Sequence, residues 1–112
     1  MDKKYLVLGA TGGIGYSFTM KLLSEGIKPT IIVRDKEKAV KLFKNNEFLE
    51  IIEGDVTDLE LLSQVAKGKN VIFHGINYPY QEWKKFMKPV TEEIIHVAKQ
   101  NNATILFPGN IY

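Results

Sequence analysis

The stretch YLVLGATGGIG, residues 5–15, joins a short apolar run directly to a turn that contains four glycines. Residues 5–8 have the length and composition of a strand that is buried on both faces. Residues 13–26 then carry apolar side chains at spacings of three and four, which is typical of an amphipathic helix. A strand, a glycine-rich turn and a helix are the first half of a βαβ unit.

The rest of the chain alternates further apolar runs with helical patterns. We expect strands at residues 30–33, 48–52, 70–74 and 104–107, and helices at 36–45, 57–68 and 81–100. Because the alternation is strict, the sheet should be parallel with helices on both faces, and right-handed crossovers give the strand order 3-2-1-4-5. The predicted fold class is α/β: one Rossmann-like, doubly wound domain of three layers over residues 1–112, cut short after the fifth strand.

Three local signals mark the expected helix boundaries. Gly26 is a C-cap candidate for the first helix. Thr57, followed by Glu60 three residues later, has the spacing of a capping box. Pro89 lies inside the pattern of residues 81–100 and should kink that helix or divide it in two.

The composition excludes several classes of protein. The chain has 112 residues, 15 basic and 13 acidic side chains, a net charge of +2 and no cysteine. Its charges are dispersed, so no basic stripe indicates a nucleic-acid partner. The absence of cysteine excludes disulfides and thiolate metal sites and suits a reducing compartment. Because the N-terminal apolar run is too short for a secretory signal or a membrane span, we expect a soluble, cytoplasmic protein.

The glycine-rich turn is the main candidate for a binding site. Gly9 would permit the tight turn, Gly12 would let the backbone approach a pyrophosphate, and Gly15 would let the helix pack closely on the strand. The helix N-terminus would offer N–H groups and a partial positive charge to the phosphates. A purely structural turn is the alternative, but the position between strand and helix favours a dinucleotide. The predicted contacts are Gly9, Thr11, Gly12, Gly13, Ile14 and Gly15.

The end of the second strand bears on which dinucleotide is bound. Arg34 stands where NAD-binding chains usually carry an acidic residue for the ribose hydroxyls. A guanidinium there would pair with a 2′-phosphate, and Lys36 and Lys38 could add charge. We therefore predict NADP(H), with NAD(H) as the alternative if Asp35 points into the site. Arg34 could also be only a solvated charge at the end of a strand.

The ends of the third and fourth strands complete the predicted cofactor site, because ligands bind at the carboxyl ends of such strands. Asp55 could accept from the adenine amino group, with Val56 against the ring; a turn or capping role for Asp55 is the alternative. His74 and Gly75 end the fourth strand, and we expect His74 to be packed rather than catalytic. An aromatic cluster could cover the nicotinamide or belong to the core or an interface: Tyr78, Tyr80 and Trp83.

Several segments together resemble the extended and atypical short-chain dehydrogenase/reductases, including the NAD-dependent epimerase/dehydratase group. The matching segments are GATGGIG at 9–15, VRD at 33–35, GDVTD at 54–58, VIFH at 71–74 and LFPGNIY at 106–112. The resemblance covers essentially the whole chain. It implies that the glycines, Arg34, Asp55 and Val56 contact the cofactor, and an arginine at that position is similar to the NADPH-preferring members.

The chain departs from that family at the catalytic positions. No Tyr-x-x-x-Lys pair follows the fifth strand, Pro108-Gly109-Asn110 replaces the expected serine or threonine, and Tyr112 resembles a structural tyrosine. We therefore predict no catalytic residue here. The chain would be the cofactor-binding portion of a larger oxidoreductase, epimerase or dehydratase, inactive by itself. The alternative is a regulatory module that senses NADP(H).

The expected end of the sheet also predicts association. The strand at 104–107 would be an exposed edge, and the helix at 81–100 would lack the neighbour that it has in relatives. Exposed edges and apolar patches favour pairing. We therefore expect a homo-oligomer through that edge or that helix.

Overall fold

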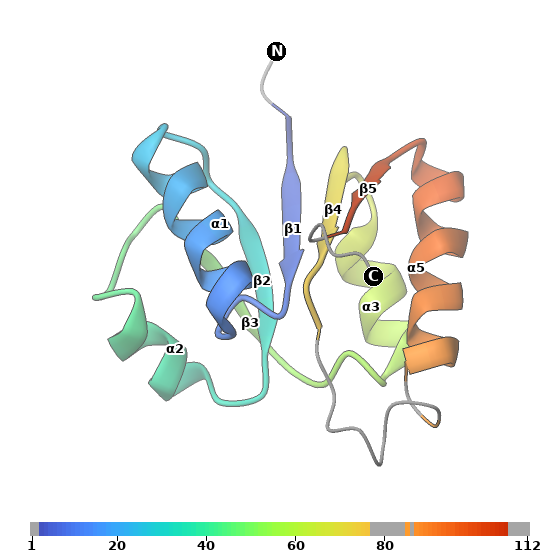
Figure 1. The fold of residues 1–112 in the computed structure, drawn as a ribbon, viewed down its shortest axis with the longest axis horizontal. Coiled ribbons are helices and arrows are strands. Elements are labelled where there is room, and N and C mark those ends of the chain that lie inside the picture. Colours follow the sequence, from blue (N-terminus) through green and yellow to red (C-terminus); the bar gives the residue numbers. More distant parts are fainter. Residues whose placement is uncertain (1–2, 77–84, 86, 108–112) are drawn as a thin grey trace.

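The computed structural model of the protein describes residues 3–76, 85 and 87–107 (Figure 1). In chain order these residues form β1 (Tyr5–Leu8), α1 (Gly13–Ser24), β2 (Thr30–Val33), α2 (Lys36–Leu42), β3 (Glu50–Glu53), α3 (Leu59–Ala66), β4 (Val71–His74), α5 (Lys88–Asn101) and β5 (Thr104–Leu106). The strands form one parallel sheet in the order β3-β2-β1-β4-β5, which confirms the predicted fold and strand order.

The sheet is covered on both faces, as Figure 1 shows: α1 and α2 lie on one side, and α3 and α5 on the other. Successive residues of a strand point to opposite faces. Leu6 and Leu8 of β1 therefore pack with the apolar side chains of α3 and α5. Val7, between them, packs with those of α1 and α2. All four residues of β2 and of β4 are buried, which explains why these strands are mostly apolar rather than alternating, with Thr30 and His74 as their buried polar residues.

Several strand and helix boundaries differ from the expected ones, among them those of the third strand and the second helix. The third strand begins at Glu50, two residues later than predicted, and includes Glu53. The helix expected to reach residue 45 ends at Leu42, because Lys44 and Asn45 adopt left-handed backbone conformations that stop it. Gly26 ends α1 with φ +79°, as predicted for its position.

The predicted capping box at Thr57 was wrong. The N-cap of α3 is Asp58, whose side chain accepts a hydrogen bond from the Leu61 backbone N–H at 3.2 Å. Thr57 is not available for this role, because its backbone N–H and its hydroxyl both donate to Oδ1 of Asp55. The carboxylate two residues earlier thus displaces the helix start by one position.

Pro89 lies in the first turn of α5, which directly follows π-helical backbone at Lys85 and Met87. A proline in the first turn of a helix costs no hydrogen bond within that helix, because the N–H groups there have no partner in it. The earlier part of the predicted helix, at 81–84 and 86, lies outside the described residues, as do Tyr78, Tyr80 and Trp83. No helix in the described part of the chain is long and apolar enough to cross a lipid bilayer.

Candidate functional site

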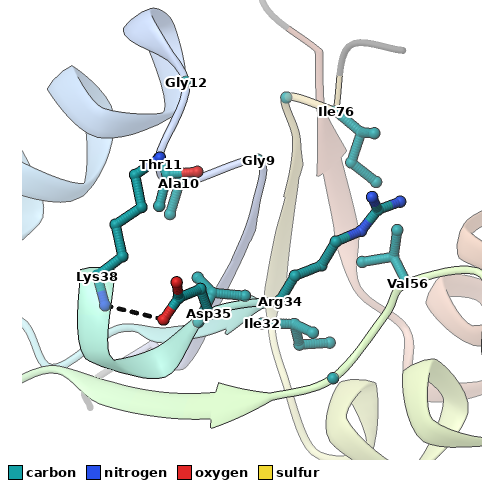
Figure 2. A pocket seen from close by; sticks show the side chains of 13 residues that line it. Gly9, Ala10, Thr11, Gly12, Ile32, Arg34, Asp35, Lys38, Val56 and Ile76 are labelled. Carbon is teal, nitrogen blue, oxygen red and sulfur yellow. Dashed lines mark hydrogen bonds between the residues drawn. The ribbon is translucent and has the colours of Figure 1, made fainter. Parts of the chain in front are cut away.

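A cavity of about 480 Å³ opens at the carboxyl ends of the central strands (Figure 2). Its walls are the glycine-rich turn after β1, the end of β2 with the start of α2, and the segments that follow β3 and β4. The lining residues are Gly9, Ala10, Thr11, Gly12, Ile32, Val33, Arg34, Asp35, Lys38, Gly54, Val56, Gly75 and Ile76. The cavity therefore lies where parallel α/β sheets bind their ligands.

Two glycines make the turn after β1 possible. Gly9 has φ +79°, and a Cβ there would collide with the carbonyl group of Gly75. Gly15 lies in the first turn of α1, and a Cβ there would collide with the carbonyl oxygen of Gly9. The chain thus turns sharply at the first glycine and packs closely at the second, which are the two structural roles predicted for them.

The N-terminus of α1 faces this turn without a side-chain cap. The N-cap is Gly12, and the first turn of the helix contains no acidic residue. The Gly12 backbone N–H donates to the Gly9 carbonyl at 3.1 Å, which fixes the turn. Uncapped N–H groups at a helix start, together with the helix dipole, suit a bound anion such as a phosphate.

Two basic side chains lie on the opposite side of the cavity. Arg34 follows β2 directly, and Lys38 is in α2. Figure 2 shows Lys38 extending from α2 toward the turn at Thr11, while the Arg34 guanidinium lies toward Ile76. Their positive charges bracket the part of the cavity at the end of β2. Lys36, the other lysine named from the sequence, does not line the cavity.

Asp35 lies between these two cations and has a structural role. It is the N-cap of α2, and its Oδ1 accepts from the Lys38 backbone N–H at 3.1 Å. Its side chain also lines the cavity (Figure 2). The Asp35 carboxylate thus points into the cavity. In the sequence analysis, NAD(H) was the alternative cofactor if Asp35 had this orientation.

Asp55 is held in place by its neighbours on both oxygens. Oδ1 accepts from the backbone N–H and the hydroxyl of Thr57, at 2.9 and 2.8 Å, and Oδ2 lies 3.2 Å from Nε of Arg34. Burial by itself raises the pKa of the Asp55 carboxyl, but the hydrogen bonds from Thr57 and the charge of Arg34 outweigh it and hold the pKa below its usual value. Asp55 is thus ionised, and it lies beside the cavity rather than in its lining.

His74 is packed behind the cavity and is 3% exposed. Its Nε2 lies 2.9 Å from the Thr91 hydroxyl, and Nδ1 is buried with no partner among the described residues. Burial lowers the pKa of His74 to about 4, so the ring is neutral at physiological pH. The packed environment agrees with what was expected of this residue.

The cavity brings together six of the predicted contact residues and leaves five outside its lining. Inside are Gly9, Thr11, Gly12, Arg34, Val56 and Gly75. Outside are Gly13, Ile14, Gly15, Asp55 and His74. The sequence did not single out the apolar lining residues Ile32 and Ile76, because an isoleucine in or after a buried strand is ordinary core composition. No group of three potential metal ligands occurs within the described ranges.

Comparison with known proteins agrees with this geometry. A family model described as NAD(P)H-binding matches residues 9–106. A proposed epimerase of Bacteroides thetaiotaomicron is 30% identical, with a TM-score of 0.75 over 96% of this chain and 47% of that one. Two further structures share the fold. The Bordetella bronchiseptica enzyme WbmH with NAD⁺ is 22% identical, with a TM-score of 0.77 over 92% of this chain and 37% of that one. A Veillonella parvula short-chain dehydrogenase/reductase with NADP is 21% identical, with a TM-score of 0.73 over 96% of this chain and 47% of that one.

The matches also show that relatives are longer. The curated relatives are 31–45% identical over the aligned parts, and the chain spans 20–36% of their lengths. The family match covers most of the chain, from the glycine turn to the last strand. The resemblance drawn from the sequence is thereby confirmed: the chain belongs to the NAD(P)H-binding family, and the solved structures that it resembles include an epimerase-type protein and a short-chain dehydrogenase/reductase.

Proposed function

We propose that this NAD(P)-binding domain prefers NADP(H) and serves an oxidoreductase, epimerase or dehydratase by holding the nicotinamide cofactor. The observation that carries the proposal is the pairing of two features in one cavity. An uncapped helix N-terminus lies on one side, Arg34 lies on the other, and Lys38 extends from α2 toward the glycine turn. A dinucleotide with an extra phosphate on its adenosine ribose matches that charge distribution.

The cofactor would lie along the carboxyl ends of the strands. Gly12 and the N–H groups that follow it would bind the pyrophosphate. The adenosine would occupy the end of the cavity at Arg34, with Val56 and Ile76 as its apolar contacts. The remaining predicted contacts at Gly13, Ile14, Gly15, Asp55 and His74 would act from beside or behind the lining. When bound, the nicotinamide supplies hydride transfer, and these residues bind and orient it.

The balance of charge in the cavity supports NADP(H) over NAD(H). Two cations and one carboxylate line the region at the end of β2. One oxygen of that carboxylate, in Asp35, already accepts from the backbone of α2. The cavity lining by itself, without the neighbouring Asp55, thus has a net positive charge that favours a 2′-phosphate, and NAD(H) remains the alternative if Asp35 accepts from the ribose hydroxyls instead.

Titration of NADPH and NADH, followed by nicotinamide fluorescence, tests the preference. We expect Arg34→Ala to weaken NADPH binding about tenfold and Lys38→Ala by a smaller factor, with NADH affinity nearly unchanged. Lys36→Ala is the matched control, because it removes the same charge from the same helix but from outside the cavity. Equal affinities for the two cofactors in the unaltered chain would contradict the proposal.

A regulatory module that senses NADP(H) is the second candidate function. It is favoured by the sequence Pro108-Gly109-Asn110, which stands where the family that the chain resembles carries a serine or threonine. Oxidation of NADPH by the whole protein with carbonyl substrates distinguishes the two candidates. A Tyr-x-x-x-Lys pair in coding sequence beyond Tyr112 would support the enzyme, and its absence there would support the sensor.

The predicted homo-oligomer also stays a proposal. Among the described strands, β5 pairs only with β4, and its exposed apolar side chains include Leu106 at 37%. An unpaired edge with apolar side chains favours association through that edge or through the α5 side of the sheet. Light scattering at high concentration should show a dimer or larger species, and a single monomeric species would contradict this.

A further inference from the structure

The Asp55 carboxylate has both of its oxygens engaged by the protein. Oδ1 accepts two hydrogen bonds from Thr57, and Oδ2 lies 3.2 Å from Nε of Arg34. The neighbouring Val56 lines the cavity, whereas Asp55 does not. This arrangement points the carboxylate at the arginine rather than at a ligand, so a direct contact with adenine does not explain it.

The Arg34–Asp55 ion pair adds little to the stability of the fold. The two side chains are 72% and 41% exposed, and ion pairs with that exposure contribute little. The pair does restrict where the long Arg34 side chain can lie. The contact is made by Nε, and Figure 2 shows the two terminal nitrogens directed toward the side of the cavity with Val56 and Ile76.

We propose that Asp55, held by Thr57, is a positioning residue that orients Arg34 for the 2′-phosphate of NADP(H). The inference rests on the proposed function. A long side chain that is fixed before binding loses less freedom when the ligand arrives, which increases affinity without a new contact to the ligand. Asp55 would thus raise the preference for NADPH although its own negative charge repels phosphate.

Thr57→Val and Thr57→Ser form the matched pair that tests this. Valine removes the hydroxyl donor at nearly constant volume and constant charge, and serine keeps the donor. Three reduced cofactors are titrated: NADPH, NADH and deamino-NADH, in which hypoxanthine replaces adenine. We expect Thr57→Val to lower the NADPH-over-NADH preference by about two- to fivefold and Thr57→Ser to retain it.

An arginine-free background provides the second measurement. In Arg34→Ala the preference should not respond to Thr57→Val, since the side chain to be positioned is absent. Thermal melts establish that each variant is folded, and Thr57→Ala replaces the valine variant if that one does not fold.

Each remaining outcome overturns one specific statement. If the Thr57→Val chain is folded and keeps the original NADPH-over-NADH preference, Asp55 and Thr57 do not position Arg34. A change in the discrimination between NADH and deamino-NADH shows that Asp55 acts on the adenine amino group instead. If the unaltered chain binds NADPH and NADH equally, the proposed cofactor preference itself fails, and this inference fails with it.

Discussion

The two sides of the cofactor cavity are built from different parts of the chain. On the side of the glycine turn, backbone atoms of Gly9, Gly15 and Gly75 approach so closely that a Cβ on Gly9 or Gly15 would collide. On the side of β2 and α2, exposed side chains of Arg34 and Lys38 supply the surface. The first side is a consequence of folding, whereas the second can change without altering the fold. The class of ligand is thus tied to the packed side, and the choice between related ligands to the exposed side.

A methyl group at Gly9 should disrupt the packing of the glycine turn and cause the largest loss of stability. Gly9→Ala places a Cβ against the Gly75 carbonyl at a residue with φ +79°. We expect a loss of about 3 kcal/mol or more in the free energy of unfolding, because a strained backbone and a steric collision add. Chemical denaturation measures it.

Gly13→Ala is the matched control in the same turn. A Cβ at Gly13 would meet no atom within 4 Å, and the residue is the first of α1. Alanine favours a helix over glycine, so the change in stability should lie within about 1 kcal/mol. If the two variants were equally stable, close packing at Gly9 would not be what requires a glycine at this position.

The pH dependence of stability tests whether His74, behind the packed side, is buried. The pKa of His74 is lowered by burial to about 4, against 6.5 for the exposed group. Above pH 6.5 the ring is neutral in both folded and unfolded chains. As the pH falls from 6.5 to 4 the unfolded chain takes up the proton first, so the contribution of His74 lowers stability by up to about 3 kcal/mol and does not change further below pH 4.

Denaturation between pH 7 and 4 measures this, with one histidine removed at a time. His74→Asn should flatten the pH dependence of stability, whatever it costs at pH 7. His96→Asn is the control, since His96 is exposed on α5. A chain whose stability depends on pH in the same way with and without His74 would show that the ring is not buried as described.

The fold could be predicted because local and long-range signals agreed. Strands β1 and β2 lie at the predicted residues, since strands buried on both faces are mostly apolar and end at turn residues. Errors occurred where two residues competed for one role. Thr57 and Asp58 both suit an N-cap, and the outcome depended on Asp55, which the capping rule does not consider.

The site could be predicted on its packed side and only in part on its exposed side. Gly9 and Gly12 belong to a motif whose spacing follows from backbone geometry. The Arg34–Asp55 pair could not be predicted, because it depends on the register of β2 against β3, where Val33 lies beside Glu53. The sequence analysis gave only bounds for the third strand, 48–52, and these end before Glu53.

Asp35 gives the smallest expected effect, and it tests the exposed side by itself. An asparagine side chain can still cap α2, so Asp35→Asn should change stability by only a few tenths of a kcal/mol, whereas Asp35→Ala should lose about 1 kcal/mol. Both substitutions remove a negative charge from the cavity lining, so both should strengthen NADPH binding by about threefold. Fluorescence titration of NADPH and NADH measures this. If Asp35→Asn instead weakens NADH strongly and leaves NADPH unchanged, Asp35 binds the ribose hydroxyls, and the preference for NADP(H) no longer follows from the charges around the cavity.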